Sequence, residues 1–274
     1  MRGKINNIEL VYEQGSSALN EDSLTCSDNL FGVFDGASSL VSDRYLGKTG
    51  AWWASRLVSQ EFSRNDSSLF ELGSRANKKL QLQMTAMGVE SSDRLKSWST
   101  SAAVCRLQDD SIEWLQSGDC QILAIEESGA CRLLTSYHNH DRETLQKWQQ
   151  LLADNTPQPR EALHPQLVKV RRQMNSSYGA LNGEQAALDF FQTGSCSLAG
   201  IAHLLIFTDG LFPPGENPAE EPDFCWLADY YQQGGLEKVK QEIRKREKHD
   251  PECRRYPRFK MHDDIAAVAI SFQQ

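Results

Sequence analysis

Four acidic clusters, each beside a short apolar run, hold the residues whose types and positions could do chemistry. They lie at residues 20–22, 35–36, 209–210 and 263–264. Carboxylates at the ends of buried strands can converge on one cleft, where they repel one another unless a cation neutralises them. Mg²⁺ and Mn²⁺ are hard cations that take oxygen ligands. A single Asp-Gly pair usually indicates only a turn, but the four clusters together predict a metal site built from distant residues.

The composition is that of a soluble enzyme. The chain has 274 residues, of which 39% are hydrophobic and 24% charged, and we expect one domain over 1–274. A net charge of −8 argues against nucleic-acid binding. The absence of a signal-like start and of an apolar run of about 20 residues predicts a cytoplasmic protein with no membrane contact.

The seven cysteines are scattered and include no Cys-x-x-Cys pair, so a thiolate zinc site is not expected. They are interpreted mostly as small core residues in a reducing compartment.

The hydrophobic pattern predicts strands in two groups that are separated by helices, which favours an α+β fold with packed sheets. We expect strands at 5–12, 31–34, 101–107, 112–116, 121–125, 131–135, 204–208 and 265–272, and helices at 45–62, 68–87 and around 236–243. The least regular stretch, 137–200, contains a candidate helix at 142–152. It is interpreted as an insertion or flap over the sheet and not as a separate domain.

The acidic set suits a pair of divalent ions. Two such ions held about 3.5–4 Å apart can clamp a phosphate and generate hydroxide between them. Asp35 is the best bridging ligand, because Gly36 lets the backbone carbonyl and an ion approach closely. Asp209 and Asp263 complete the expected ligand set. Glu21 and Asp22 are expected to hold metal-bound waters.

Five motifs in order along nearly the whole chain carry a family resemblance. They are residues 20–22, 31–36, 118–119, 207–210 and 263–265. This series resembles the PPM-type metal-dependent protein phosphatases, the protein phosphatase 2C family. The resemblance implies a four-layer α-β-β-α sandwich of two antiparallel sheets flanked by helices, with two Mn²⁺ or Mg²⁺ ions at one end.

The resemblance also implies roles for individual residues. Asp35 bridges both ions and the Gly36 carbonyl binds one of them, while Asp209 and Asp263 hold the other. Glu21 and Asp22 act through water, and Asp22 is expected to be catalytic together with Asp35, Asp209 and Asp263. Asp119, with Asp209, matches a carboxylate that holds a third, weaker ion in some members.

The implied chemistry is attack of a metal-bridging hydroxide on phosphorus, without a phosphoenzyme. The leaving alkoxide then needs a proton from a water or a histidine. His138 is a weak candidate for that acid, with a surface histidine as the alternative. His262, beside Asp263, is a better candidate for supporting a ligand.

Two positions depart from the family pattern and leave the phosphate-binding residue unknown. Ser17 stands where members commonly carry an arginine that binds the substrate phosphate, and 37–39 replace the usual His-Gly. Serine cannot supply the charge or bidentate geometry of arginine. Three arginines are weak candidates to replace it, two of them in the basic run 254–260. They are Arg44, Arg255 and Arg258. These departures indicate a divergent, bacterial branch.

The leading hypothesis is a metal-dependent phosphatase with a role in signalling, which removes phosphate from phosphoserine or phosphothreonine of a protein. One alternative is a catalytically weak or inactive pseudophosphatase that binds a phosphoprotein as a regulator. Another is a phosphatase of small molecules. The physiological substrate, the opposing kinase, the preferred metal and the oligomeric state are left open by the sequence.

Overall fold

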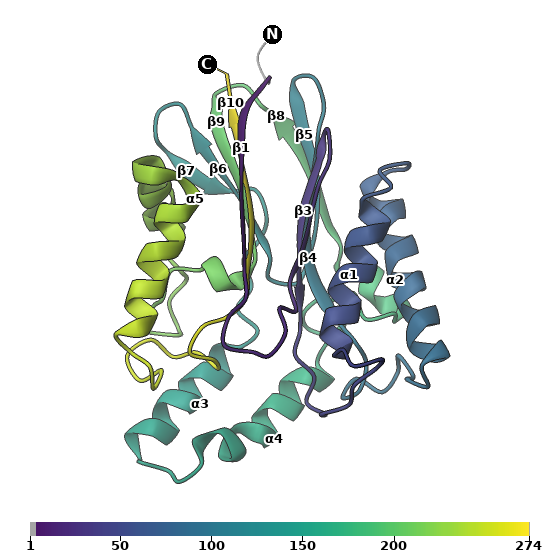
Figure 1. Cartoon of the computed structure of the whole chain (residues 1–274), viewed down its shortest axis with the longest axis vertical. Coiled ribbons are helices and arrows are strands. Elements are labelled where there is room, and N and C mark those ends of the chain that lie inside the picture. The colour runs from purple at the N-terminus through teal and green to yellow at the C-terminus, as the bar shows by residue number, and fades with distance from the viewer. Residues whose placement is uncertain (1–3, 274) are drawn as a thin grey trace.

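Two five-stranded antiparallel sheets form the centre of the protein in this computed structural model, which describes residues 4–273 (Figure 1). The first sheet has the order β1 (Ile5–Glu13), β10 (Ile265–Phe272), β9 (Ile201–Phe207), β6 (Gln121–Glu126), β7 (Cys131–Leu133). The second has the order β2 (Ser23–Cys26), β3 (Leu30–Gly36), β4 (Thr100–Leu107), β5 (Ser111–Ser117), β8 (Gln192–Ser197).

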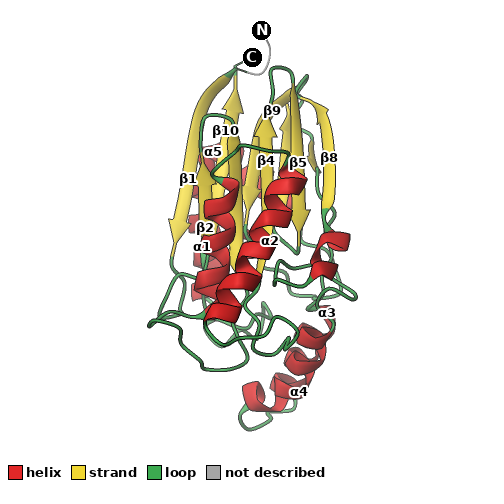
Figure 2. Ribbon diagram, turned by 90° about the vertical axis from the view of Figure 1, so that its right-hand side faces the viewer, coloured by secondary structure: helices red, strands yellow, loops and turns green. Residues whose placement is uncertain are grey.

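Helices cover the outer face of each sheet, which confirms the predicted four-layer sandwich. α1 (Gly50–Phe62) and α2 (Leu69–Ala86) lie on the second sheet, and α5 (Phe224–Lys248) lies on the first (Figures 1 and 2). α3 (Arg142–Ala153) and α4 (Pro159–Arg172) lie beyond one end of the sandwich. Within residues 4–273, no helix is both long and apolar enough to cross a membrane.

Strand β3 shows why these residues form a sandwich. Successive side chains of a strand point to opposite faces. Leu30 and Phe34 therefore pack under α1 and α2, while Phe31 and Val33 pack against the other sheet. All four side chains are fully buried, so the strand is a continuous apolar run that ends abruptly at Asp35.

Most predicted elements are present, and the differences come from tertiary contacts. Thr49 caps α1 by accepting a hydrogen bond from the backbone N–H of Trp52, so the helix begins at residue 50 and not at 45. The predicted irregular stretch contains β8, which pairs with β5 as a sheet edge, and the helix α4. α5 begins at Phe224 and is interrupted by non-helical backbone at Gly234 and Gly235, so the helix predicted around 236–243 corresponds to its part after this kink.

Two of the cysteines, interpreted mostly as small core residues in a reducing compartment, form a disulfide instead. Cys131 of β7 and Cys225 of α5 form a disulfide, with Cα atoms 5.8 Å apart. Cys105, Cys120 and Cys253 are buried thiols, as expected. The two bonded cysteines are 94 residues apart, so spacing alone carried no signal of their pairing.

Candidate metal centre

The acidic residues of the first sheet come from three neighbouring strand ends. Phe207, the last residue of β9, pairs with Gln121 at the start of β6 and with Ala267 near the start of β10. Asp209 follows β9, while Asp119 and Asp263 precede β6 and β10. The register therefore brings these three carboxylates to one edge.

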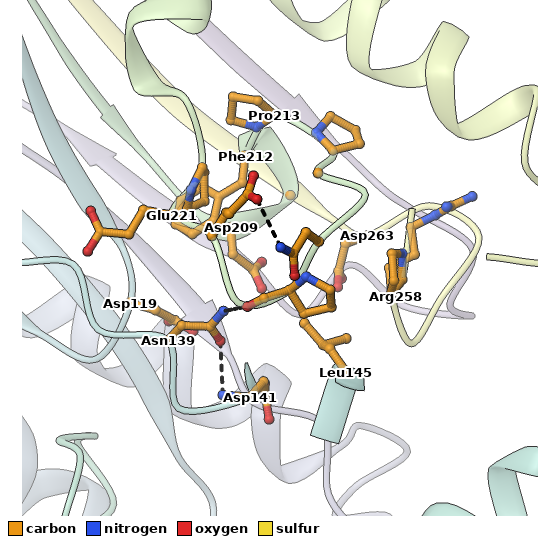
Figure 3. Close-up of a pocket in the computed structure, with 18 of the residues that line it drawn as sticks. Asp119, Asn139, Asp141, Leu145, Asp209, Phe212, Pro213, Glu221, Arg258 and Asp263 are labelled. Carbon is orange, nitrogen blue, oxygen red and sulfur yellow. Dashed lines mark hydrogen bonds between the residues drawn. The ribbon is translucent and has the colours of Figure 1, made fainter. Parts of the chain in front are cut away.

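Asp35 approaches the same place from the second sheet. It lies at the end of β3, where it pairs with Ser101 of β4. Asp119, Asp209 and Asp263 line a common cleft of about 410 Å³, which α3 borders through Leu145 (Figure 3). The loop 212–223 forms another wall of this cleft.

The carboxylates are close enough that the charge of each raises the pKa of its neighbours. Burial raises the pKa of Asp35 well above its usual range, and the charges of Asp22, Asp119 and Asp263 raise it further. Burial likewise raises the pKa of Asp209, with added repulsion from Asp35, Asp263 and Asp119. Such groups favour either protons or a cation.

Glu21 and Asp22 are held in place by hydroxyl groups. Thr208 Oγ1 donates to Asp22 Oδ2 at 2.8 Å, and Ser38 Oγ donates to Glu21 Oε2 at 2.6 Å. Asp22 is almost fully buried, and burial is the main reason why its pKa is raised. Thr208 thus connects the end of β9 to a carboxylate beside the second sheet.

Asp264 has a structural task that its neighbour Asp263 does not share. Its buried carboxylate accepts hydrogen bonds from the backbone N–H of Gly15, at 2.7 Å, and of Glu21, at 2.8 Å. The N-terminal loop is thereby tied to the start of β10. This tie fixes the backbone of Glu21 beside the start of β10.

The glycines after Asp35 and Asp209 are needed for close packing. A Cβ on Gly36 would lie 2.5 Å from the carbonyl oxygens of Glu21 and Ala51, and one on Gly210 would collide with the carbonyl oxygen of Asp264. Gly36 therefore has a packing reason besides the access of an ion to its carbonyl.

The donor set fits divalent ions in its chemistry. Asp119 lines the cleft, and its Oδ1 is buried with no hydrogen-bond partner, so this oxygen is free to accept a bond. Across residues 4–273, no three acidic, histidine or cysteine side chains are yet gathered at the spacing that holds one ion. The carboxylates are close enough to raise one another's pKa. To share one ion as ligands, they would have to move closer together.

Lys260 is the member of the basic run that reaches the carboxylates. Its Nζ lies 2.7 Å from Asp263 Oδ1, and it lines the cleft. Arg258 is instead paired with Asp250 at 2.8 Å, and Arg255 with Glu216 at 2.8 Å. Arg44 is exposed on the loop between β3 and α1.

Arg171 of α4 is a cation that the sequence analysis missed. Its Nη2 donates to the Ser38 carbonyl at 2.7 Å and its Nη1 to Ser99 Oγ at 3.2 Å. Burial lowers the pKa of the Arg171 guanidinium, and the nearby Tyr178, Asp141 and Glu21 offset this only in part. No motif marks this residue, because only the folding of α4 against the site brings it there.

Histidines surround the site without entering the expected ligand set. His138 is exposed and lines the cleft. His262 Nδ1 lies 2.8 Å from Glu247 Oε2 and so faces α5. His140, which the sequence analysis missed, lies 4.0 Å from Asp119 and 3.6 Å from Asp141, with its ring stacked on Tyr178.

A sequence model described as protein phosphatase 2C matches residues 14–246, which is most of the chain. The chain belongs to the protein phosphatase 2C family. It is thereby classed as a metal-dependent protein serine/threonine phosphatase, and members of this family act on phosphorylated proteins. A search of curated proteins found no match.

Solved structures share the fold of this phosphatase at low sequence identity. The catalytic domain of PstP in complex with two manganese ions is 15% identical, with 98% of each chain covered and a TM-score of 0.59. Stp1 from Staphylococcus aureus is 15% identical, with 99% of this chain and 96% of that chain covered and a TM-score of 0.59. RsbX in complex with magnesium is 10% identical, with 100% and 99% covered and a TM-score of 0.53.

We predict that Asp209→Asn stabilises the metal-free phosphatase at pH 8. The raised pKa of Asp209 means that the native state binds a proton that the unfolded state releases above about pH 3.9. The stability of the metal-free protein should therefore fall as pH rises from about 5 toward 8, until the native group has titrated. In the variant, the free energy of unfolding should decrease less with rising pH. Its melting temperature at pH 8 should therefore be a few degrees higher than that of the wild type, since each kcal/mol shifts it by about 2–4 °C.

Thermal unfolding in EDTA at pH 5 and pH 8 measures this difference. Asp229→Asn is the matched control, because Asp229 is exposed on α5. A variant that melts at or below the wild-type temperature at pH 8 would contradict the predicted repulsion.

We also predict that Thr208→Val destabilises the fold by about 1–3 kcal/mol, because it strips a hydrogen bond from the buried Asp22 carboxylate. The Ala266 N–H loses its acceptor as well. Thr208→Ser keeps the hydroxyl and should stay close to wild type. Urea unfolding compares the two variants, and equal stability would show that the hydroxyl is dispensable.

Proposed function

We propose that this protein hydrolyses phosphoserine or phosphothreonine in a protein substrate, with two Mn²⁺ or Mg²⁺ ions in the carboxylate cleft. The observation that supports it most is that Asp119, Asp209 and Asp263 line one cleft while the charge of Asp35, from the second sheet, acts on Asp209, in a chain of this family. A single phosphatase domain with a flap made of α3 and α4 is part of the proposal. A cytoplasmic, signalling role stays a prediction of the sequence.

The ligand assignment follows the positions of the carboxylates. Asp35 would bridge the two ions, and the Gly36 carbonyl would bind one of them. Asp209 and Asp263 would hold the other, while Glu21 and Asp22 would orient waters. Bound ions supply positive charge to the phosphate and activate the attacking water.

A third, weaker ion would be held by Asp119 with Asp209. The unpartnered Asp119 Oδ1 supports this assignment. His140, near Asp119, and His138, at the cleft, are the histidines placed to give a proton to the leaving alkoxide.

Arg171 is proposed to supply the positive charge that Ser17 cannot. Its guanidinium is fixed by Ser38 and Ser99 beside Glu21, and arginine has more donors than these two contacts use. A guanidinium held in this way can bind two phosphate oxygens at once.

The first experiment is hydrolysis of para-nitrophenyl phosphate and a phosphothreonine peptide with Mn²⁺, Mg²⁺ or EDTA. We expect turnover with either metal, none in EDTA, and loss of at least about 10³-fold in Asp35→Asn and Asp209→Asn, because each removes a ligand charge. Asp119→Asn should lose less. Near-normal turnover in Asp209→Asn would disprove the metal assignment.

Two other outcomes of the same assay would support the alternatives. No hydrolysis of either substrate in any condition, with metal bound to the protein, would favour the regulatory pseudophosphatase. Preference for small phosphomonoesters over the peptide would favour a small-molecule phosphatase.

Arg171→Ala should lower kcat/KM by about 10–100-fold, mainly through KM. A hydrogen bond to a charged group contributes about 1.5–3 kcal/mol, and each 1.36 kcal/mol is tenfold in rate. Inhibition by inorganic phosphate should weaken in parallel. Arg172→Ala is the matched control, since Arg172 is exposed on the same helix. Unchanged phosphate inhibition in Arg171→Ala would assign the charge elsewhere.

A further inference from the structure

The side chain of Lys260 carries a positive charge into the carboxylate cleft. Lys260 lies on the segment 249–264, between α5 and β10, three residues before Asp263. Its Nζ lies 2.7 Å from Asp263 Oδ1, with 25% of the lysine side chain and 37% of the aspartate side chain exposed. The pair thus lies at the cleft and is partly shielded from solvent.

The charge of Lys260 acts on more than its nearest partner. Asp263, Asp35 and Asp209 all raise the pKa of the Lys260 ammonium, against the effect of burial. In turn, Lys260 opposes the rise in the pKa of Asp35. One tethered cation therefore faces three carboxylates that converge from both sheets.

These three carboxylates are the ones that the proposed function assigns to a single divalent ion. An ammonium group and a metal ion cannot both use Asp263 Oδ1 at close range, because the two cations repel each other. We propose that Lys260 occupies the second cation position of this site, so that the second divalent ion binds only when Lys260 leaves Asp263. This inference rests on the proposed metal site and not on turnover.

An ordinary surface ion pair is the competing explanation. Lys245 and Glu242 form such a pair on α5, 3.7 Å apart, with the lysine side chain 65% exposed. Pairs of that kind contribute little. Lys260 differs because it is less exposed and because carboxylates from three separate segments share its charge.

Competition by a tethered group has a definite effect on binding. The apparent dissociation constant equals the intrinsic one divided by the fraction of molecules that are competent to bind. If Lys260 is engaged in nine-tenths of the molecules or more, the second ion binds at least about tenfold more weakly than the carboxylates alone would allow. The first ion, bound by Asp35 and the Gly36 carbonyl, is affected less.

The test is a titration of the metal-stripped full chain with Mn²⁺, followed by calorimetry and by the EPR signal of free Mn²⁺. Lys260→Met keeps the length of the side chain and removes its charge, whereas Lys260→Arg keeps the charge. Lys240→Met is the matched control, because Lys240 pairs with Glu13 and Glu237 away from the cleft. Circular dichroism confirms that each variant is folded.

We expect Lys260→Met to bind the second Mn²⁺ at least about tenfold more tightly, with Lys260→Arg and Lys240→Met close to wild type. In EDTA, Lys260→Met should also melt at a lower temperature than wild type, because three carboxylates have lost their counter-charge. Tighter binding together with lower metal-free stability is a pattern that a merely structural ion pair would not produce.

Unchanged or weaker binding of the second ion in Lys260→Met would overturn the inference. Equal binding in Lys260→Met and Lys260→Arg would also overturn it, because charge would not be the cause. The readout is binding, so the inference can fail while the protein hydrolyses phosphopeptides. It can equally hold for a protein that binds metal without turnover.

Discussion

Repulsion among buried carboxylates is the constraint on which the rest of this structure depends. Asp22, Asp35 and Asp209 each have a raised pKa, because burial and neighbouring acids disfavour their charged forms. A fold that holds such groups together must stabilise them by hydrogen bonds, by protons or by cations. Hydrogen bonds from Thr208 and Ser38 stabilise Asp22 and Glu21, and the ammonium of Lys260 pairs with Asp263.

The two sheets supply the rigidity that this arrangement needs. The pairing of Phe207 with Gln121 and with Ala267 fixes three strand ends against one another, and Asp35 closes the set from the second sheet. Sites built on strand ends are more precisely placed than sites on free loops. The hydrogen bonds of Thr208 and Asp264 then join the sheets at the cleft.

Positive charge reaches the cleft from segments outside the sandwich. Arg171 comes from helix α4 and Lys260 from the segment before β10. The contacts of these two cations differ. Arg171 is fixed by neutral oxygens and suits a phosphate, whereas Lys260 is bound to a carboxylate and suits competition with a metal.

The sequence by itself predicted packed sheets and the acidic set, because apolar runs that stop at Asp35 and Asp209 are local signals, and the family resemblance of its motifs implied the four-layer sandwich. It did not determine β8, α4 or the bond between Cys131 and Cys225, since these depend on contacts between residues far apart in the chain. The basic run was visible, but only tertiary structure decided that Lys260 pairs with Asp263 in the cleft, while Arg258, which also lines the cleft, pairs with Asp250 and Arg255 pairs with Glu216. Spacing restricts which residues can be ligands, whereas long-range packing decides which charges meet.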